Sequence, residues 1–307
     1  MRRLAALLIA CSCTLPAGSP DERVSRVANG VYTLRFDARR TPDGTVVPAR
    51  SSFIVGPEGV AVIDTGMSYA DGRAILDAIA HTTHAPVRIA ILTHPSQEAI
   101  FGAAAFAERG VPVAMHADAA RLMAARCGAC LERLRGAFGT DAMKGTRLVE
   151  PTRELRDGET LRDTGRPLTI LAPAWSSAPG AVALLDGETS TLIAGSLVTV
   201  AAVPDLRDGD VPRWRAALAR LAATRCAHLV PAHGPIGTCR DIEAFRGYLE
   251  ALDARVAELF ARGVELGDVA AQCELPRYAS WEGYADLHGA NASREYLRLE
   301  REALARP

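Results

Sequence analysis

Two histidines and one glutamate are the residues of this chain best placed to do chemistry. His94 ends an apolar run over 87–93, Glu98 follows it by four residues, and His233 follows a second apolar run over 227–231. Imidazole nitrogens and carboxylate oxygens are ligands that zinc accepts, and they are also frequent general acids and bases. The three residues therefore define a candidate site for a weakly held metal ion or for metal-free acid–base chemistry.

The elements that must position these residues alternate between strand and helix, and the strand pattern starts at Val27. The predicted strands cover 31–36, 51–55, 60–63, 87–93, 111–115, 168–172, 181–185, 190–195 and 227–231, and the predicted helices cover 70–81, 100–109, 117–140, 211–223 and most of 242–307. This alternation is typical of an α/β fold. Hydrophobic residues make up 49% of the 307 residues, which suits a large core. The net charge of −1 predicts no nucleic-acid partner.

The first residues carry an export pattern. A pair of arginines precedes the apolar stretch Leu4–Ala10, which is too short to span a bilayer. The stretch ends in Leu8-Ile9-Ala10-Cys11, which is similar to a bacterial lipobox. We therefore expect a lipoprotein signal peptide and tether over 1–22, lipidation of Cys11, and anchoring to a membrane in the bacterial periplasm. An ordinary signal peptide cut nearby is the alternative, and it would also export the protein.

Cysteine spacing suggests two close pairs. Seven cysteines in an oxidising compartment indicate disulfides, and Cys226 and Cys239 could close a loop of about 14 residues. Cys127-Gly-Ala-Cys130 could be a tight disulfide or a redox pair. Its surroundings predict a helix without the βαβ context of a thioredoxin motif, which disfavours the redox interpretation.

Four short motifs in order resemble the metallo-β-lactamase fold over about 27–240. They are Asp64-Thr65-Gly66, Thr93-His94, Gly195 and Pro231-Ala232-His233-Gly234. The resemblance implies an αββα sandwich of two mixed β-sheets flanked by helices, with the site on loops along one edge. It also implies that Asp64 braces the site from behind the ligands.

One branch of that fold, the quinoprotein relay system zinc metallohydrolases, is similar in finer detail. The segments that carry this similarity are 126–132, 143–146 and 281–284, together with His288, Asn291 and 296–300. The similarity implies a setting near periplasmic quinoproteins. We expect a metallo-β-lactamase-like domain over 23–240, with a helical CxxC insertion at about 117–147, and a helical C-terminal extension over 241–307.

Most zinc ligands that the resemblance implies are absent. Where the fold has His-x-His-x-Asp-His, this chain has His94-Pro95-Ser96-Gln97-Glu98-Ala99, and serines stand at two further ligand positions, Ser177 for a histidine and Ser196 for the bridging aspartate. Serine hydroxyls are poor zinc ligands beside imidazoles and carboxylates. We therefore expect no cofactor, with weak zinc binding by His94, Glu98 and His233 as the alternative.

The same residues allow other roles. His94 and His233 could be loop residues that hydrogen-bond the backbone, or could serve a metal-free site with one of the three serines as nucleophile. His288 could line the pocket mouth with Trp281 and Tyr284, although core packing is favoured.

Three functions compete. A non-catalytic binding or accessory protein, with a periplasmic quinoprotein or a small metabolite as partner, is favoured over a hydrolase with a reduced metal site. A redox protein that uses Cys127 and Cys130 is the third.

Overall fold

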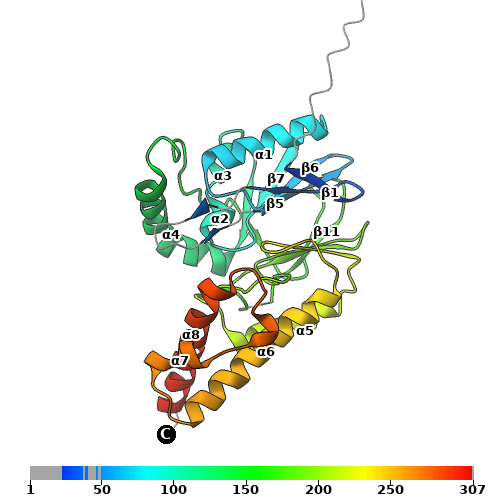
Figure 1. The fold of residues 1–307 in the computed structure, drawn as a ribbon. Helices are drawn as coiled ribbons and strands as arrows, with labels where there is room; N and C mark the ends of the chain where they lie inside the picture. Colours follow the sequence, from blue (N-terminus) through cyan, green and yellow to red (C-terminus); the bar gives the residue numbers. More distant parts are fainter. Residues whose placement is uncertain (1–22, 37–38, 41–45, 48–49, 174, 306–307) are drawn as a thin grey trace, which may run out of the picture.

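Four layers make up the computed structural model, which describes residues 23–36, 39–40, 46–47, 50–173 and 175–305. Two β-sheets face each other and helices cover their outer faces (Figure 1). The predicted αββα sandwich is therefore confirmed. Residues 1–22, with Cys11, lie outside the described residues. None of the described helices is long and apolar enough to cross a membrane.

The first sheet has seven strands in the order β1-β2-β5-β6-β7-β8-β9. These are β1 (Val24–Ala28), β2 (Val31–Arg35), β5 (Arg50–Gly56), β6 (Gly59–Ile63), β7 (Val87–Ile91), β8 (Val113–His116) and β9 (Arg153–Leu155). The sheet is mixed, because pairing is antiparallel from β1 to β6 and parallel from β6 to β9. The first strand begins at Val24, before the predicted start at Val27, since this edge strand is only partly buried and shows little apolar alternation. Strands β3 (Arg39–Arg40) and β4 (Val46–Val47) form a separate ribbon.

The second sheet has five strands in the order β10-β11-β12-β13-β14. These are β10 (Thr160–Leu161), β11 (Leu168–Leu171), β12 (Ala183–Asp186), β13 (Thr191–Gly195) and β14 (His228–Pro231). Only the last pair, β13 and β14, is parallel. Side chains alternate across this sheet as the period of a strand requires. Leu184 and Ile193 face the first sheet, whereas Leu192 and Leu229 face the outer helices.

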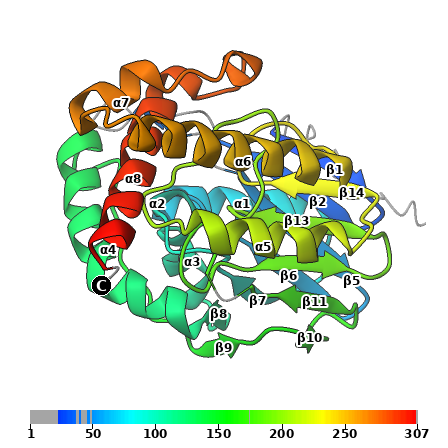
Figure 2. The same ribbon diagram turned by 90° about the horizontal axis from the view of Figure 1, so that it is seen from below.

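Helices cover both outer faces (Figure 2). The first sheet carries α1 (Tyr69–Thr82), α2 (Gln97–Ile100), α3 (Ala103–Ala107) and α4 (Ala117–Phe138). The second carries α5 (Val211–Ala222), α6 (Arg240–Ala261), α7 (Leu266–Gln272), a 3₁₀ turn (Pro276–Tyr278) and α8 (Tyr284–Leu304). Residues of α5, α6 and α8 share one hydrophobic core with the second sheet. The C-terminal helices are thus part of the outer layer.

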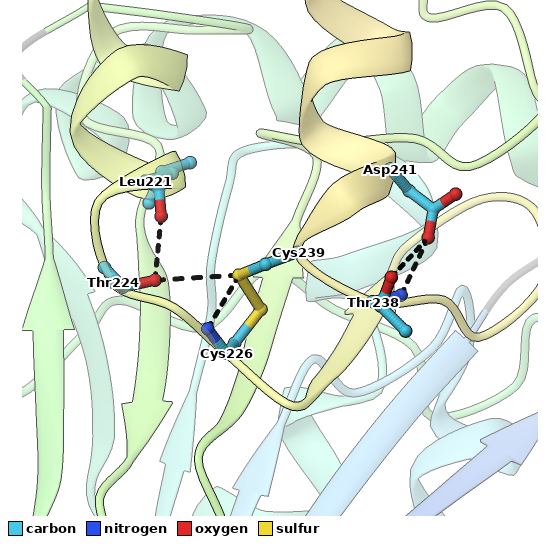
Figure 3. Close-up of a disulfide and its surroundings, with 6 residues drawn as sticks. All are labelled: Leu221, Thr224, Cys226, Thr238, Cys239 and Asp241. Atoms are coloured by element: carbon cyan, nitrogen blue, oxygen red, sulfur yellow. Dashed lines mark hydrogen bonds between the residues drawn. A yellow bond between two sulfur atoms is a disulfide. The ribbon is translucent and has the colours of Figure 1, made fainter.

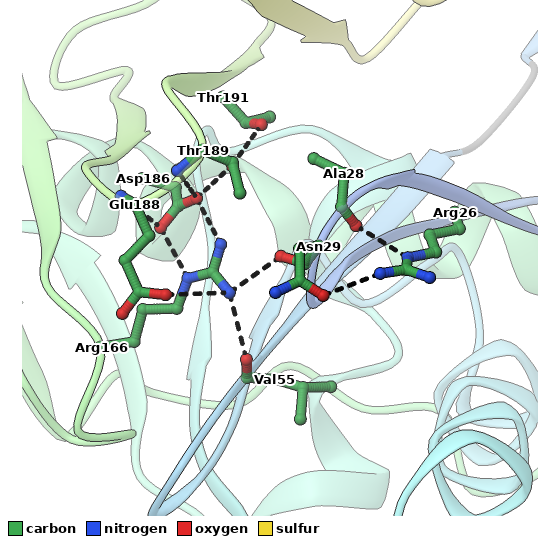
Figure 4. Close-up of polar contacts among 9 residues, drawn as sticks. All are labelled: Arg26, Ala28, Asn29, Val55, Arg166, Asp186, Glu188, Thr189 and Thr191. Carbon is green, nitrogen blue, oxygen red and sulfur yellow. Dashed lines mark hydrogen bonds and ion pairs between the residues drawn. The ribbon is translucent and has the colours of Figure 1, made fainter.

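A buried ion pair ties the two sheets together at one end (Figure 4). Arg166 donates to both carboxylate oxygens of Asp186, and its Nη1 donates to the backbone oxygens of Asn29 and Val55. Val55 pairs with Val60 at the start of β6, so this link lies at the opposite edge from the end of β6. Both charged side chains are almost fully buried, and their hydrogen bonds offset the cost of removing them from water.

His288 belongs to the core of the C-terminal helices and not to a pocket. Its Nδ1 lies 3.0 Å from the Tyr248 hydroxyl, and its Nε2 lies 2.5 Å from the carbonyl of Cys273. The ring also stacks on Tyr284. Burial lowers the pKa of this histidine, which favours the neutral ring. The favoured interpretation of His288 as a packing residue is therefore correct.

Candidate functional site

One pocket of about 760 Å³ gathers the candidate residues. It opens at the edge where β6, β7, β13 and β14 end, since parallel strands place their carboxyl ends on the same side. Six of the seven sequence-predicted motif positions line it: His94, Ser96, Glu98, Ser177, Ser196 and His233. The seventh, Ala99, is buried away from the pocket, and its carbonyl accepts hydrogen bonds from the backbone and hydroxyl of Thr65.

The carboxylate of Glu98 lies between the two imidazoles. Its Oε1 is 3.5 Å from His94 Nε2 and 3.6 Å from His233 Nε2. Burial would raise the pKa of Glu98, but hydrogen bonding and charge from the two histidines outweigh burial and hold it well below its usual range. Burial would lower the pKa of His94, but Glu98 and Asp64 outweigh it and raise that pKa. The carboxylate of Glu98 thus contacts both imidazoles, of which His94 is buried and His233 is partly exposed.

Asp64 holds His94 in place through Thr93. The Asp64 carboxylate accepts from the backbone N–H of Thr93 at 2.8 Å and from its hydroxyl, and that hydroxyl lies 2.7 Å from His94 Nδ1. A hydroxyl has one proton, so when Thr93 donates to Asp64 it accepts from His94 Nδ1. This chain of contacts directs His94 Nε2 toward the pocket. The Nε2 atom is buried, and its contact with Glu98 Oε1, at 3.5 Å, is longer than an ordinary hydrogen bond.

The serines at two ligand positions contact each other. Ser177, in the loop before β12, and Ser196, directly after β13, place their hydroxyl oxygens 2.7 Å apart. Neither hydroxyl is paired with a histidine. The Oγ of Ser96 is buried without a hydrogen-bond partner. The described residues therefore contain no serine–histidine hydrogen bond that would activate a nucleophile.

Two glycines let the site loops approach closely. A Cβ on Gly195 would lie 2.5 Å from the Thr93 hydroxyl, and a Cβ on Gly234 would lie 1.8 Å from the carbonyl of Val200. Both glycines have φ in the left-handed region, at +52° and +90°. The first contact brings the end of β13 against the end of β7, and the second fixes the loop that carries His233.

The donor groups do not fit the zinc that the resemblance implies. Zinc takes four N, O or S donors at about 2.0–2.3 Å around one point. In the part of the chain that the structure describes, no three His, Cys, Asp or Glu side chains are arranged to hold a metal ion. Glu98 instead lies between His94 and His233, and the hydroxyls of Ser177 and Ser196 are committed to each other.

The pocket walls contain residues that the sequence did not place at this site. Helix α4 contributes Arg126, Cys130 and Arg133, which are spaced i, i+4 and i+7 and so share one helix face. The sequence shows that spacing, but it does not show which element this helix face opposes. The same helix contributes Leu122, and the other walls come from Ala202, Val203, Asp205, Arg207, Asp208, Glu282 and Leu287. Salt bridges join Arg126 to Asp208 and Arg207 to Asp205.

The two predicted cysteine pairs differ in the structure. Cys226 and Cys239 form a disulfide with a Cα–Cα distance of 5.3 Å, and this pairing is therefore confirmed (Figure 3). It joins the start of α6 to the segment before β14. Cys127 and Cys130 are free thiols, so the tight disulfide considered for them is not formed. Both line the pocket.

Comparison with known proteins places this geometry in a family. The model of the metallo-beta-lactamase superfamily matches residues 44–233. No curated protein sequence matches the chain.

Solved structures are similar in fold. A metallo-beta-lactamase from Pontibacter korlensis is 23% identical with a TM-score of 0.62, and the match covers 74% of this chain and 98% of that one. The metallo-beta-lactamase FIM-1 from Pseudomonas aeruginosa, in its mono-zinc form, is 18% identical with a TM-score of 0.60, covering 76% and 97%. One from Hirschia baltica is 19% identical with a TM-score of 0.59, covering 74% and 96%. At these identities the similarity shows the fold alone.

Proposed function

Because this chain belongs to the metallo-beta-lactamase superfamily, we propose that it uses the pocket of that fold to bind a small molecule without a catalytic metal ion. The observation that carries this proposal is the position of Glu98 between His94 and His233. Contact with His94, whose pKa Glu98 and Asp64 raise against burial, compensates the charge of this carboxylate without a metal ion. The pocket is retained at a volume that suits a small organic ligand.

Two buried polar atoms indicate what the ligand supplies. His94 Nε2 and Ser96 Oγ have no hydrogen-bond partner, and both residues line the pocket. An unsatisfied buried polar group costs about 1–3 kcal/mol, so a ligand oxygen that pairs with these atoms would recover that cost. Leu122, Val203 and Leu287 offer an apolar surface for the rest of the ligand. The ligand class is therefore a small molecule with an apolar body and an oxygen acceptor.

The cellular setting is part of the proposal. The N-terminal arginines, the short apolar stretch and Cys11 support export and lipid anchoring in the bacterial periplasm. The similarity of segments 126–132 and 281–284 to the quinoprotein relay branch supports an accessory role beside a periplasmic quinoprotein. The bound molecule would then be a metabolite handled by that system.

A hydrolase with one metal ion, held by fewer ligands than the fold usually has, is the second candidate. His94, Glu98 and His233 supply two nitrogens and one carboxylate, and His94 Nε2 is unsatisfied. Elemental analysis of the purified chain after exposure to zinc separates the two candidates. We expect far less than one equivalent of zinc, unchanged by His233→Ala. About one equivalent that is lost on His233→Ala would favour the hydrolase.

Ligand binding is tested independently of metal. Leu122→Trp fills the pocket, and Leu297→Trp places the same side chain at an exposed position outside it. Mass spectrometry of molecules released on denaturation should find one small molecule with the parent chain and with Leu297→Trp, and none with Leu122→Trp. Equal release from both variants, or none from the parent incubated with periplasmic extract, would contradict binding in this pocket.

A further inference from the structure

Two free thiols lie on the wall of the pocket. Cys127 and Cys130 lie on α4, and both line the pocket. The Sγ of Cys127 is buried and lies 3.7 Å from the carbonyl of Pro95, directly after His94. Cys130 is half-buried. Of the two thiols that line the pocket, Cys130 is thus the more exposed.

Cys130 has a cationic neighbour that no carboxylate neutralises. Arg133 Nη2 lies 3.3 Å from Cys130 Sγ, and no ion pair involves Arg133 in the described part of the chain. Arg126 and Arg207, in contrast, pair with Asp208 and Asp205. The hydrogen bond from Cys127 is the largest cause that lowers the pKa of Cys130, to about 6, and the charges of Arg133 and Arg207 act in the same direction against burial. The Cys127 pKa is raised, chiefly by its hydrogen bond to Cys130 and by burial.

The helix can bend between the two cysteines. Residues three apart in an α-helix have Cα atoms about 5 Å apart, within the range that a disulfide spans. A Cβ on Gly128 would meet nothing within 4 Å, so packing does not require glycine there. A glycine inside a helix costs about 1 kcal/mol relative to alanine. Its presence between the cysteines lowers the cost of bending the helix when the sulfurs join.

We propose that Cys127 and Cys130 form a thiol–disulfide exchange site on the pocket wall, and that its substrate is a small disulfide carrying an anionic group. Cys130 is the attacking residue because it is the more exposed, and Cys127 resolves the mixed disulfide. Arg133 binds the anionic group. This activity goes beyond the proposed binding function, since it uses the α4 wall and not the histidines.

The chemistry balances in two exchanges. The Cys130 thiolate attacks one sulfur of the substrate, which forms a mixed disulfide and releases the first substrate thiolate. Cys127 then loses its proton to solvent and attacks Cys130 Sγ, which forms the Cys127–Cys130 disulfide and releases the second thiolate. The protein dithiol is oxidised by two electrons, and the substrate disulfide is reduced to two thiols.

Glutathione disulfide is a suitable anionic probe. The full-length, reduced protein is mixed with it at pH 6, quenched with acid and digested with trypsin, which cuts after Arg126 and Arg133 and leaves both cysteines in one peptide. We expect this peptide to become lighter by two hydrogens while two glutathione thiols are released. At pH 6 a thiol of pKa about 6 is half ionised and should react about tenfold faster than free cysteine, after allowance for its lower intrinsic nucleophilicity.

Variants separate the roles of the two cysteines. Cys127→Ser should trap glutathione on Cys130, and Cys130→Ser should abolish the reaction. Arg133→Gln should slow the reaction with glutathione disulfide several-fold more than the reaction with cationic cystamine, because both lose thiolate on Cys130 but only the anionic substrate loses its binding partner. Gly128→Ala should slow the second exchange and accumulate the mixed disulfide. Cys273 is buried, with a pKa raised by burial to about 11, and should remain unmodified as an internal control.

Three outcomes would overturn the exchange site. The peptide could react no faster than free cysteine, Cys130→Ser could react like the parent, or the pair could already be joined and resist a mild dithiol, as a structural disulfide does. None of these outcomes affects the small-molecule proposal, which is measured on Leu122→Trp. Conversely, loss of ligand binding with an intact exchange reaction would overturn only the proposed function.

Discussion

The hydroxyl oxygens of Ser177 and Ser196 lie 2.7 Å apart, so two loops of the pocket floor are joined by a hydrogen bond. These are the positions where the metallo-β-lactamase resemblance places a histidine ligand and the bridging aspartate. The two serines hydrogen-bond each other, and the carboxylate of Glu98 lies between His94 and His233. Contacts within the protein thus hold the loops of the pocket floor together.

Restoring imidazoles should restore zinc binding. In the double variant Ser96→His, Ser177→His, both new imidazoles would point into the pocket beside His94, because all three positions line it. Three imidazoles and a water complete a tetrahedral zinc site. Elemental analysis should then find about one equivalent of zinc. The matched control Ser96→Asn, Ser177→Asn has similar polar bulk without imidazoles and should bind none; zinc in neither variant would mean that the loops no longer have the required geometry.

The fold could be predicted because its motifs follow strands. Asp64, His94 and His233 each come after an apolar run, and the structure places all three at the same edge of the sandwich. The sequence also identified six pocket-lining positions. It could not show that Ser177 and Ser196 bond to each other, because that contact joins residues from two loops at hydrogen-bond range.

The pocket walls escaped prediction for a different physical reason. Arg133 and Glu282 lie on segments far apart in the chain, and their presence at one pocket depends on how α4 and the C-terminal helices pack. A helical pattern gives the face of a helix but not the partner of that face. The interpretation of the CxxC segment rested on the lack of a βαβ context, whereas the structure places the thiols on the wall of the pocket.

The buried Arg166–Asp186 pair should dominate the link between the sheets. Asp186→Asn removes the buried carboxylate partner of Arg166 and leaves only the more distant, exposed carboxylate of Glu188 at 3.7 Å, which costs about 3–5 kcal/mol. Glu154→Gln removes an ion-pair partner of Arg156 on the surface and should change the free energy of unfolding by less than about 1 kcal/mol. Urea unfolding followed by circular dichroism measures both values. Similar losses of unfolding free energy in the two variants would show that water solvates Arg166 when Asp186 is replaced.

Removing the Cys226–Cys239 disulfide should lower stability, because the unfolded chain gains conformational entropy without it. The bond closes a loop with a sequence separation of 13, and the loop-entropy model gives about 3 kcal/mol for a loop of this size. We expect Cys226→Ala, Cys239→Ala to lower the free energy of unfolding, measured in urea, by about that amount, and complete reduction of this disulfide in the parent to have the same effect. Cys130→Ser, which removes a free thiol, should have the same free energy of unfolding as the parent, both with and without reductant.

Glu295 should make the protein less stable as the pH rises. It lies on α8 with 3% of its side chain exposed, and burial together with nearby Asp253 raises its pKa to about 7, although Arg298 opposes the shift. A carboxyl with a raised folded pKa binds its proton more tightly in the folded state, so the stability it contributes is present near pH 4 and is lost as the pH rises toward 7. The difference is about 3 kcal/mol. Urea midpoints of the parent at pH 5 and pH 8 should therefore differ more than those of Glu295→Gln, which has no titrating proton. Glu243→Gln, at an exposed position on α6, should keep the parental difference, and equal differences in all three proteins would rule out Glu295 as the titrating group.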